Sequence, residues 1–280
     1  MSAGVRVPGA DDAPAFAFRT HPLGRVEAPD AETFARRWLA PREPVVLTGL
    51  TRGWAPPSIW APDSMGARWG AARVVAAELA GGTLRDDPHQ GVLFRRIALR
   101  TFTASLGSPG SARHYVMAPT WNFPPLFQET FRVPAYCTGA PHLRAKVWLG
   151  KAGTVTPLHR DVPHNLHVHL HGRKRWLLFP PGARGMYPRG VFSGMPNFST
   201  VDPERLDAAE HPRFGRTPAR VATLAPGETL FIPHGWWHHT RSLDDAVAMN
   251  FWWGGRLVQG LAHASTAWKR LRGIRRDEWT

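Results

Sequence analysis

The sequence contains a single cysteine, Cys137, among 280 residues. One thiol excludes an intramolecular disulfide and a zinc site built from several cysteines. Long apolar runs are also missing, because no stretch reaches the about 18 consecutive apolar residues of a membrane-spanning helix. Residues 1–15 lack the apolar segment of a secretory signal. These absences predict a protein of the reducing cytoplasm with no membrane partner.

Lysine is scarce as well, and it is confined to Lys146, Lys151, Lys174 and Lys269, although Lys and Arg together number 35. The net charge of +14 would suit nucleic acid or another anionic partner. A GC-rich codon usage produces the same excess of arginine without any such partner. Nucleic acid is therefore an alternative partner and not the main prediction.

Glycine and proline are abundant, with 27 of each, and 43% of the residues are hydrophobic. This composition predicts a folded chain with many turns and short strands. Short runs typical of β-strands alternate with turn residues in the second half of the chain. These runs are Ala145–Leu149, Asn165–Leu170, Arg175–Phe179, Thr229–Pro233 and Ala246–Trp253. The pattern predicts an all-β core folded as a sandwich or closed roll, with helical decoration.

The sequence pattern divides the chain into three parts. We expect an arm over residues 1–30, a domain over 31–255 and a basic amphipathic helix within 256–280. Inside the domain, Asp30 is expected to cap a helix that ends at Leu39, and residues 44–50 read as a strand. Residues 63–80 are expected to form a helix that stops at Gly81 and Gly82. Leu257 and Leu261 lie on the apolar stripe of the last helix. That stripe would either pack on its own domain or form a homodimer interface.

The strongest chemical signal lies in residues 156–161, with the sequence TPLHRD. On an extended chain His159 and Asp161 point to the same side, so both can bind one ion. A third ligand is available downstream, where a strand leads to His238 and His239. Two histidines and one carboxylate form the facial triad of non-haem iron oxygenases. Zinc hydrolases use the same donors, so the triad alone does not define the reaction.

Further polar residues follow the His-x-Asp pair. Lys174 comes just after the Gly172 turn and could bind the distal carboxylate of an oxoacid, or could be a solvated turn residue. Thr156 and Asn165 could add hydrogen bonds. Asn165 and His167 share one strand face with His169 and His171. That face either lines the barrel, which would make His167 a pocket residue, or partly faces solvent.

Four ordered blocks resemble a known family. They are PVVLTGL with Trp54, the central block TPLHRDVPHNLHVHLHGRKRWLLFPP, the block APGETLFIPHGWWHHTRSL, and MNFWW. The chain is similar over residues 32–255 to the JmjC-type, cupin-like oxygenases that depend on Fe(II) and 2-oxoglutarate. Within these it resembles the protein-hydroxylase branch, typified by the asparaginyl hydroxylase of hypoxia-inducible factor. The resemblance implies a double-stranded β-helix, or jelly roll. Residues 184–220 have no counterpart that can be aligned.

The resemblance also implies roles for individual residues. His159, Asp161 and His238 would bind iron and carry catalysis, with His239 as a neighbour. Lys174 would bind 2-oxoglutarate with help from Thr156 and Asn165. The other residues expected at the cofactor pocket are Asn250, Trp252, Tyr115 and His167.

The implied reaction uses O2 and 2-oxoglutarate to hydroxylate a C–H bond, with release of succinate and CO2. The expected substrate is a peptide or protein side chain. A small molecule or natural product, an N-methyl-lysine that loses its methyl group, and a catalytically silent metal-binding cupin are the alternatives.

Overall fold

Eight antiparallel strands form the centre of the computed structural model, which describes residues 16–271 except 85, 88–90, 109, 111, 191, 192 and 194. The strands are β10 (His142–Gly150), β11 (Val155–Arg160), β12 (His164–His171), β13 (Lys174–Phe179), β14 (Ala219–Leu224), β15 (Thr229–Ile232), β16 (Trp237–Ser242) and β17 (Ala246–Gly254). They form two four-stranded layers, ordered β10-β17-β12-β15 and β14-β13-β16-β11. Successive strands alternate between the layers, except that β13 and β14 pair within the same layer, and this arrangement is typical of a jelly roll. The predicted fold class is confirmed.

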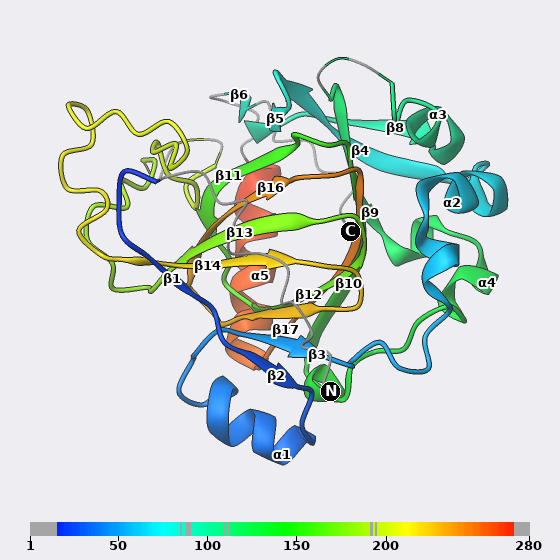
Figure 1. The fold of residues 1–280 in the computed structure, drawn as a ribbon, viewed down its shortest axis with the longest axis horizontal. Coiled ribbons are helices and arrows are strands. Elements are labelled where there is room, and N and C mark those ends of the chain that lie inside the picture. Colours follow the sequence, from blue (N-terminus) through cyan, green and yellow to red (C-terminus); the bar gives the residue numbers. More distant parts are fainter. Residues whose placement is uncertain are drawn as a thin grey trace, which may run out of the picture.

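Further strands extend both layers, apart from β6 and β7, which pair with each other in a separate two-stranded sheet (Figure 1). They are β1 (Thr20–Pro22), β2 (Arg25–Glu27), β3 (Val45–Thr48), β4 (Arg73–Ala80), β5 (Thr83–Leu84), β6 (Asp86–Asp87), β7 (Gly91–Val92), β8 (Phe94–Ala98) and β9 (His114–Pro119). Strands β9, β4 and β8 continue the sheet beyond β10, whereas β3 and β2 continue it beyond β15. Strand β5 pairs with both β4 and β11, so it links the two layers.

Most of the helices are short, and the 16-residue α5 is the longest one in the described part of the chain (Figure 1). They are α1 (Ala31–Phe34), continued by the π-helical turn η1 (Ala35–Leu39), the 3₁₀ turns η2 (Pro57–Trp60), η3 (Thr120–Asn122) and η4 (Ala135–Cys137), α2 (Pro62–Trp69), α3 (Leu99–Thr103), α4 (Pro125–Gln128) and α5 (Arg256–Leu271). Asp30 caps α1 by accepting a hydrogen bond from the Thr33 N–H, as the sequence predicts. None of the helices in the described part of the chain has the length and apolarity of a membrane span.

The largest apolar core lies on the outer face of the layer that contains β12. Leu166, Val168 and Leu170 point there and pack with aromatic residues of the N-terminal half, including Trp60 and Phe127. Because alternate residues of a strand face opposite sides, Asn165, His167 and His169 point into the barrel. All three are buried. The barrel interior is therefore polar at this strand, while packing on the outside holds the strand in place.

One expectation from the sequence differs from the structure. The helix expected over residues 63–80 is wrong beyond Gly70, because α2 ends at Trp69 and residues 73–80 form β4. Alanine favours a helix locally, but β4 pairs with β5, β8 and β9, and this pairing overrides local preference. Edge strands β1 and β2 lie in the expected arm, of which residues 1–15 are outside the described part.

The final helix runs from Arg256 to Leu271, and residues 272–280 of the expected helical segment lie outside the described part of the chain. Leu257 and Leu261 are exposed on α5. A homodimer through this helix stays a prediction.

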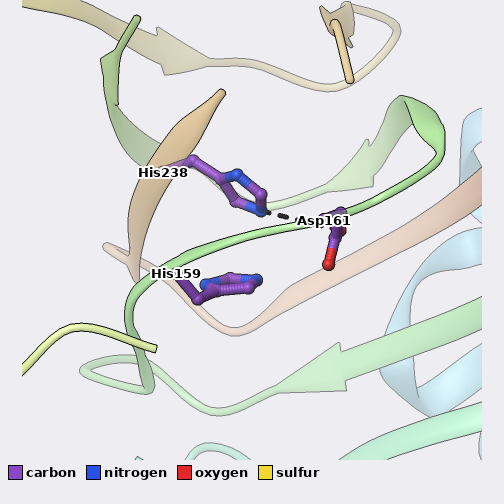
Figure 2. Close-up of side chains that lie close together, drawn as sticks. All are labelled: His159, Asp161 and His238. Atoms are coloured by element: carbon purple, nitrogen blue, oxygen red, sulfur yellow. Dashed lines mark ion pairs between the residues drawn. The ribbon is translucent and has the colours of Figure 1, made fainter. Parts of the chain in front are cut away.

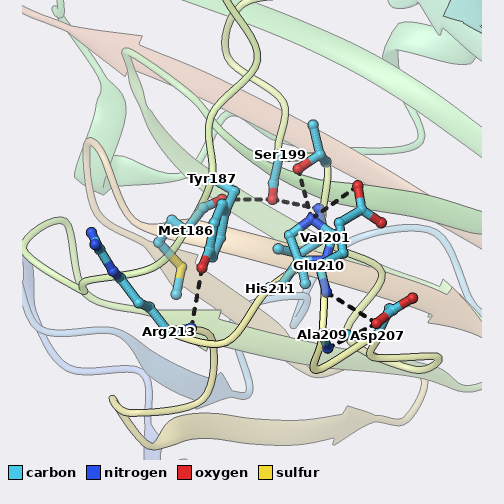
Figure 3. Close-up of polar contacts among 10 residues, drawn as sticks. Met186, Tyr187, Ser199, Val201, Asp207, Ala209, Glu210, His211 and Arg213 are labelled. Atoms are coloured by element: carbon cyan, nitrogen blue, oxygen red, sulfur yellow. Dashed lines mark hydrogen bonds and ion pairs between the residues drawn. The ribbon is translucent and has the colours of Figure 1, made fainter.

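A long connection between β13 and β14 covers the outer face of the second layer and appears in yellow-green to yellow in Figure 1. Its interior is held together by polar contacts rather than by regular elements (Figure 3). The Ser199 hydroxyl donates to the Met186 carbonyl at 2.6 Å and accepts from the Val201 N–H at 2.9 Å. Thr200 Oγ1 lies 2.9 Å from His211 Nε2. This connection contains most of the 184–220 segment that the sequence left unassigned.

Candidate metal centre

Three side chains converge at one end of the barrel (Figure 2). His159 lies on β11, His238 lies directly opposite on β16, and Asp161 immediately follows β11. The imidazole centroids are 4.1 Å apart, and His238 Nε2 is 3.8 Å from Asp161 Oδ2. One donor atom from each residue lies within 4.8 Å of the others. The structure thus brings together the three residues expected to bind a metal.

Both histidines are oriented by backbone carbonyls. His159 Nδ1 is 2.8 Å from the Pro157 oxygen, and His238 Nδ1 is 3.0 Å from the Trp236 oxygen. A carbonyl only accepts, so each Nδ1 carries the proton and each Nε2 keeps its lone pair for a ligand bond. Burial, reinforced by His159, lowers the pKa of His238 to about 3. The neutral imidazole required of a metal ligand is therefore the form present at neutral pH.

The Asp161 carboxylate is oriented by a residue of the opposite layer. Trp252 on β17 donates its indole N–H to Asp161 Oδ2 at 2.9 Å. The Asp161 side chain is 23% exposed, whereas that of His238 is 2% exposed. The cluster therefore has a buried side and a side open to solvent. Hydrogen bonds to ligand residues of this kind fix ligand geometry in metal proteins.

Lys174 begins β13 deep inside the barrel. Its ammonium donates to the Tyr115 hydroxyl at 2.7 Å, and burial lowers its pKa to about 7. Burial also raises the pKa of Tyr115, opposed by a hydrogen bond with Thr156. Gly172 has φ +72 in the preceding turn, where a Cβ would lie 2.2 Å from the Asp245 carbonyl oxygen, so only glycine fits. This turn places Lys174 beside Tyr115 and Thr156.

Unpartnered polar atoms surround this lysine. Among the described residues, the Ser242 and Thr240 hydroxyls are buried on β16 without hydrogen-bond partners. Ser242 lies opposite Lys174, and Thr240 lies opposite Thr156. Buried polar groups are nearly always hydrogen-bonded in native proteins, so these atoms indicate a site for a polar ligand. A carboxylate beside the Lys174 ammonium would accept hydrogen bonds from these hydroxyl groups, so the distal carboxylate of 2-oxoglutarate fits this site.

A network of hydrogen-bonded polar side chains lies on β12 and β17, in the layer that faces Lys174. Asn250 donates to Asn165 Oδ1, and its own Oδ1 lies 2.8 Å from His167 Nδ1. His167 Nε2 has no partner among the described residues. Burial lowers the pKa of His167 well below its usual value, so the ring is neutral. All pocket residues expected from the sequence thus lie within the barrel or at its open end.

His239 lies outside this cluster. It follows His238 on β16 and therefore points to the other face of the sheet. There it meets Asp202 and Glu204 from the long connection, with donor atoms again within 4.8 Å. Glu204 accepts from Arg175 at 2.5 Å and from Arg241 Nε at 2.6 Å. Although burial opposes it, these hydrogen bonds keep the pKa of Glu204 below its usual value.

Two residues near the metal cluster were not anticipated. Phe198, from the long connection, stacks on His159 with ring centroids 4.7 Å apart. Its segment carries no periodic pattern, so the sequence gives no signal for this contact. Lys146 on β10 is buried, with its ammonium 5.8 Å from the Trp252 ring centroid. The scarcity of lysine in the chain is the one signal that could have singled it out.

The fold and the donor set together define the class of the protein. A jelly roll with two histidines and an aspartate at its open end, and a buried lysine behind them, is the architecture of the JmjC-type, cupin-like oxygenases. A model of the cupin-like domain family matches residues 31–256, and the chain belongs to this family. The family expected from the sequence is confirmed, and its JmjC members use Fe(II) and 2-oxoglutarate.

Several curated proteins are similar to the chain. Lysine-specific demethylase 8 of Xenopus tropicalis is 29% identical over 238 residues, which are 82% of this chain and 52% of that protein. Lysine-specific demethylase JMJ30 of Arabidopsis thaliana is 30% identical, over 79% of this chain and 52% of that protein. The human bifunctional peptidase and (3S)-lysyl hydroxylase JMJD7 is 26% identical, over 79% of this chain and 80% of that protein. The chain thus spans about half the length of the first two relatives.

Proposed function

We propose that the protein is an Fe(II)- and 2-oxoglutarate-dependent dioxygenase that hydroxylates a C–H bond on a peptide or protein side chain. The observation that carries the proposal is the pairing of two sites in one barrel. The His159, Asp161 and His238 donors lie at the open end, and the buried Lys174 ammonium lies behind them among unpartnered hydroxyls. A metal binder without turnover would have no need for the second site.

The metal would be held by three residues whose side chains are oriented by neighbouring groups. His159, Asp161 and His238 would hold the metal through the two Nε2 atoms and the carboxylate. Fe(II) with 2-oxoglutarate and O2 supplies the oxidation that hydroxylates a C–H bond and releases succinate and CO2. The Trp252 indole N–H keeps the Asp161 carboxylate turned toward the histidines. The carbonyls of Pro157 and Trp236 hold the protons on Nδ1 of each ring.

The co-substrate would lie deeper in the barrel. Lys174 would form an ion pair with the distal carboxylate of 2-oxoglutarate, while Tyr115 and Thr156 donate hydrogen bonds to it. These groups are buried, so water does not compete for them. Asn165, Asn250 and His167 would line the facing wall through their mutual hydrogen bonds. A cytoplasmic location is part of the same proposal.

The choice of a peptide or protein substrate is supported by the names of the relatives, which include lysine demethylases and a lysyl hydroxylase. Removal of a methyl group from N-methyl-lysine uses the same chemistry, because a hydroxylated N-methyl group leaves as formaldehyde. A small-molecule substrate remains a second candidate class. The open side of the metal cluster, marked by the exposed part of Asp161, leaves room for either.

The proposal is tested by measuring succinate formation in the presence of Fe(II), 2-oxoglutarate and O2. We expect slow succinate release without added substrate, coupled to O2 consumption and lost when any one component is omitted. Peptide substrates should raise the rate, and a formaldehyde assay with methylated peptides separates demethylation from hydroxylation. Peptide cleavage that proceeds with Zn(II) alone and needs no 2-oxoglutarate would contradict the proposal and favour a hydrolase.

A further inference from the structure

A cavity of about 360 Å³ lies outside the barrel, between the second layer and the long connection of residues 180–218. Strands β11 and β16 contribute Arg160 and Trp237 to its lining. The connection contributes Arg213 and residues from the stretch 181–188. None of the residues that line the cavity is acidic. The proposed function uses none of these side chains, so the cavity is a candidate binding site separate from those of the metal and 2-oxoglutarate.

The cavity and the metal cluster lie at the same end of the sheet, on opposite faces. Two successive pairs of the β11–β16 ladder are His159 with His238 and Arg160 with Trp237. Neighbouring residues of a strand point to opposite faces, so the histidines point into the barrel while Arg160 and Trp237 point outward. Arg160 also immediately precedes Asp161 in the chain. A peptide bound at the metal therefore has only the edge of one sheet to cross before it reaches the cavity.

Two guanidinium groups from distant parts of the chain line this cavity. The guanidinium carbon of Arg160 lies 4.9 Å from the Trp237 ring centroid, and Arg213 lies in the long connection. In the described part of the chain, neither guanidinium has an ion pair or a hydrogen bond with another residue. A guanidinium stacked on an aromatic face still offers its N–H groups to an anion. Paired N–H groups of this kind match the geometry of a carboxylate.

The backbone around Arg213 is held by an unusual conformation. Tyr187 has φ 43, in the left-handed region that a bulky residue seldom adopts. The Tyr187 hydroxyl accepts a hydrogen bond from the Arg213 N–H at 3.1 Å (Figure 3), and its carbonyl accepts one from the Thr200 N–H at 3.0 Å. Gly185 has φ +76, and a Cβ there would lie 2.4 Å from the Arg213 carbonyl oxygen. Backbone strain concentrates at binding sites, and here it places Arg213 at the cavity.

We propose that this cavity binds an acidic side chain of the peptide substrate, several residues away from the residue that reacts. The inference rests on the proposed function and narrows its substrate class to peptides with such an acidic residue. The Asp or Glu carboxylate would accept hydrogen bonds from Arg160 and Arg213, while Trp237 and Met186 contact its carbon atoms.

The spacing between the two substrate residues follows from the geometry of the sheet. The side chains on its two faces lie roughly 10 Å apart, and an extended peptide spans at most about 3.5 Å per residue. The acidic residue is therefore expected about three or four positions from the reacting one. The net charge of +14 attracts an acidic peptide in the same sense.

The test uses binding rather than turnover. The protein is loaded with Fe(II) and 2-oxoglutarate without oxygen, and the visible band of the iron–oxoacid complex reports loading. Two pools of degenerate thirteen-residue peptides are then compared by equilibrium dialysis. They differ only at the fourth position on each side of the centre, which is Glu in one pool and Gln in the other. We expect the wild type to retain the Glu pool about fivefold better at low salt, because partly exposed charge pairs contribute modestly. The preference should shrink at about 0.5 M salt.

Arginine variants make the test specific. Arg213→Gln should remove most of the preference for the Glu pool, and Arg213→Lys should keep part of it because the charge remains. Arg160→Gln should act like Arg213→Gln, and it provides a second test if one of the two variants does not fold. Arg205→Gln is the matched control, because Arg205 is exposed in the same connection and does not line the cavity. It removes the same charge and should behave as the wild type.

The outcomes separate the inference from the proposed function. A wild type that folds but shows no iron–oxoacid band would overturn both. A normal band together with equal retention of the two pools would overturn the inference alone. The same holds if Arg213→Gln keeps the full preference for the Glu pool. If Arg205→Gln reduces the preference as much as Arg213→Gln does, the attraction comes from the overall charge of the protein and the inference is wrong.

Discussion

His238 and His239 are neighbours on one strand, yet they belong to two very different clusters. His238 points into the barrel toward His159 and Asp161, whereas His239 points outward to Asp202 and Glu204. In both clusters the three donor atoms lie within 4.8 Å of one another. In the inner cluster (His159, Asp161 and His238) the Asp161 carboxylate accepts a hydrogen bond from the neutral Trp252 indole N–H. In the outer cluster (Asp202, Glu204 and His239) the side chains of Arg175 and Arg241 neutralise the charge of Glu204. The charge around the donors, rather than their spacing, distinguishes a metal centre from an ion-pair network.

The largest effect expected from this comparison concerns metal-dependent turnover. Asp161→Ala or His238→Ala should abolish succinate formation, because each removes a ligand from a three-residue site. His239→Ala should retain turnover, because its ring lies on the other face of the sheet. Succinate formation by the three variants, measured together with Fe(II) stoichiometry, checks the prediction. Loss of iron in His239→Ala, with the protein still folded, would assign the metal to the outer cluster.

The outer cluster should matter for stability instead. Glu204→Gln leaves the Arg175 side chain, which is 7% exposed, without its carboxylate. Breaking a buried pair in this way costs about 3–5 kcal/mol of unfolding free energy. Glu27→Gln is the matched control, because its pair with Arg52 is exposed, and it should cost less than about 1 kcal/mol. Urea unfolding of both variants checks the contrast. Equal losses would show that the outer network is not a buried stabilising element.

The pocket behind the inner cluster gives the third prediction. Lys174→Met should weaken 2-oxoglutarate binding by about 2 kcal/mol or more, roughly 30-fold, because it removes the buried partner of a carboxylate. In the wild type the affinity should also fall as pH rises above about 7, since Lys174 has a pKa of about 7 and loses its charge. His238 stays neutral over this range.

Calorimetric titration of 2-oxoglutarate from pH 6 to 8.5 measures both effects. In Lys174→Met the dependence on pH should disappear. A variant that keeps the wild-type decline above pH 7 would place the titrating group elsewhere.

The smallest effect is expected at the hydrogen bond that orients Asp161. Trp252→Phe keeps an aromatic ring but removes the indole N–H, so the carboxylate loses one of its constraints. Changes of this kind typically weaken metal binding about 10–100-fold, and we expect the lower end because the ring is retained. Competition with a chelator measures the Fe(II) affinity. An unchanged affinity would mean that the strand geometry alone orients Asp161.

Several features of the candidate site could be predicted from the sequence. The His-x-Asp pair sits on an extended strand, so its common face follows from the alternation of side chains. The alternation of Leu166, His167 and Val168 likewise predicts which side of β12 is polar. Lys174 is marked by a turn glycine and by the rarity of lysine. These are local signals, and local signals identify residues that lie close together along the chain.

What could not be predicted depends on contacts between distant segments. The helix expected over 63–80 fails because β4 is fixed by three partner strands, which outweigh the helix preference of its alanines. Glu204 meets Arg175 and Arg241 only because the long connection folds back over the sheet. Phe198 reaches His159 for the same reason. The position of Lys146 beside Trp252 requires the pairing of β10 with β17.

The most direct test of the account is an anaerobic titration of 2-oxoglutarate into the Fe(II)-loaded protein, followed by the visible charge-transfer band of the chelated iron. We expect this band in the wild type and in His239→Ala, and we expect its loss in Asp161→Ala. If the wild type binds iron and remains folded but shows no band, the inner cluster is not the centre of a 2-oxoglutarate-dependent oxygenase.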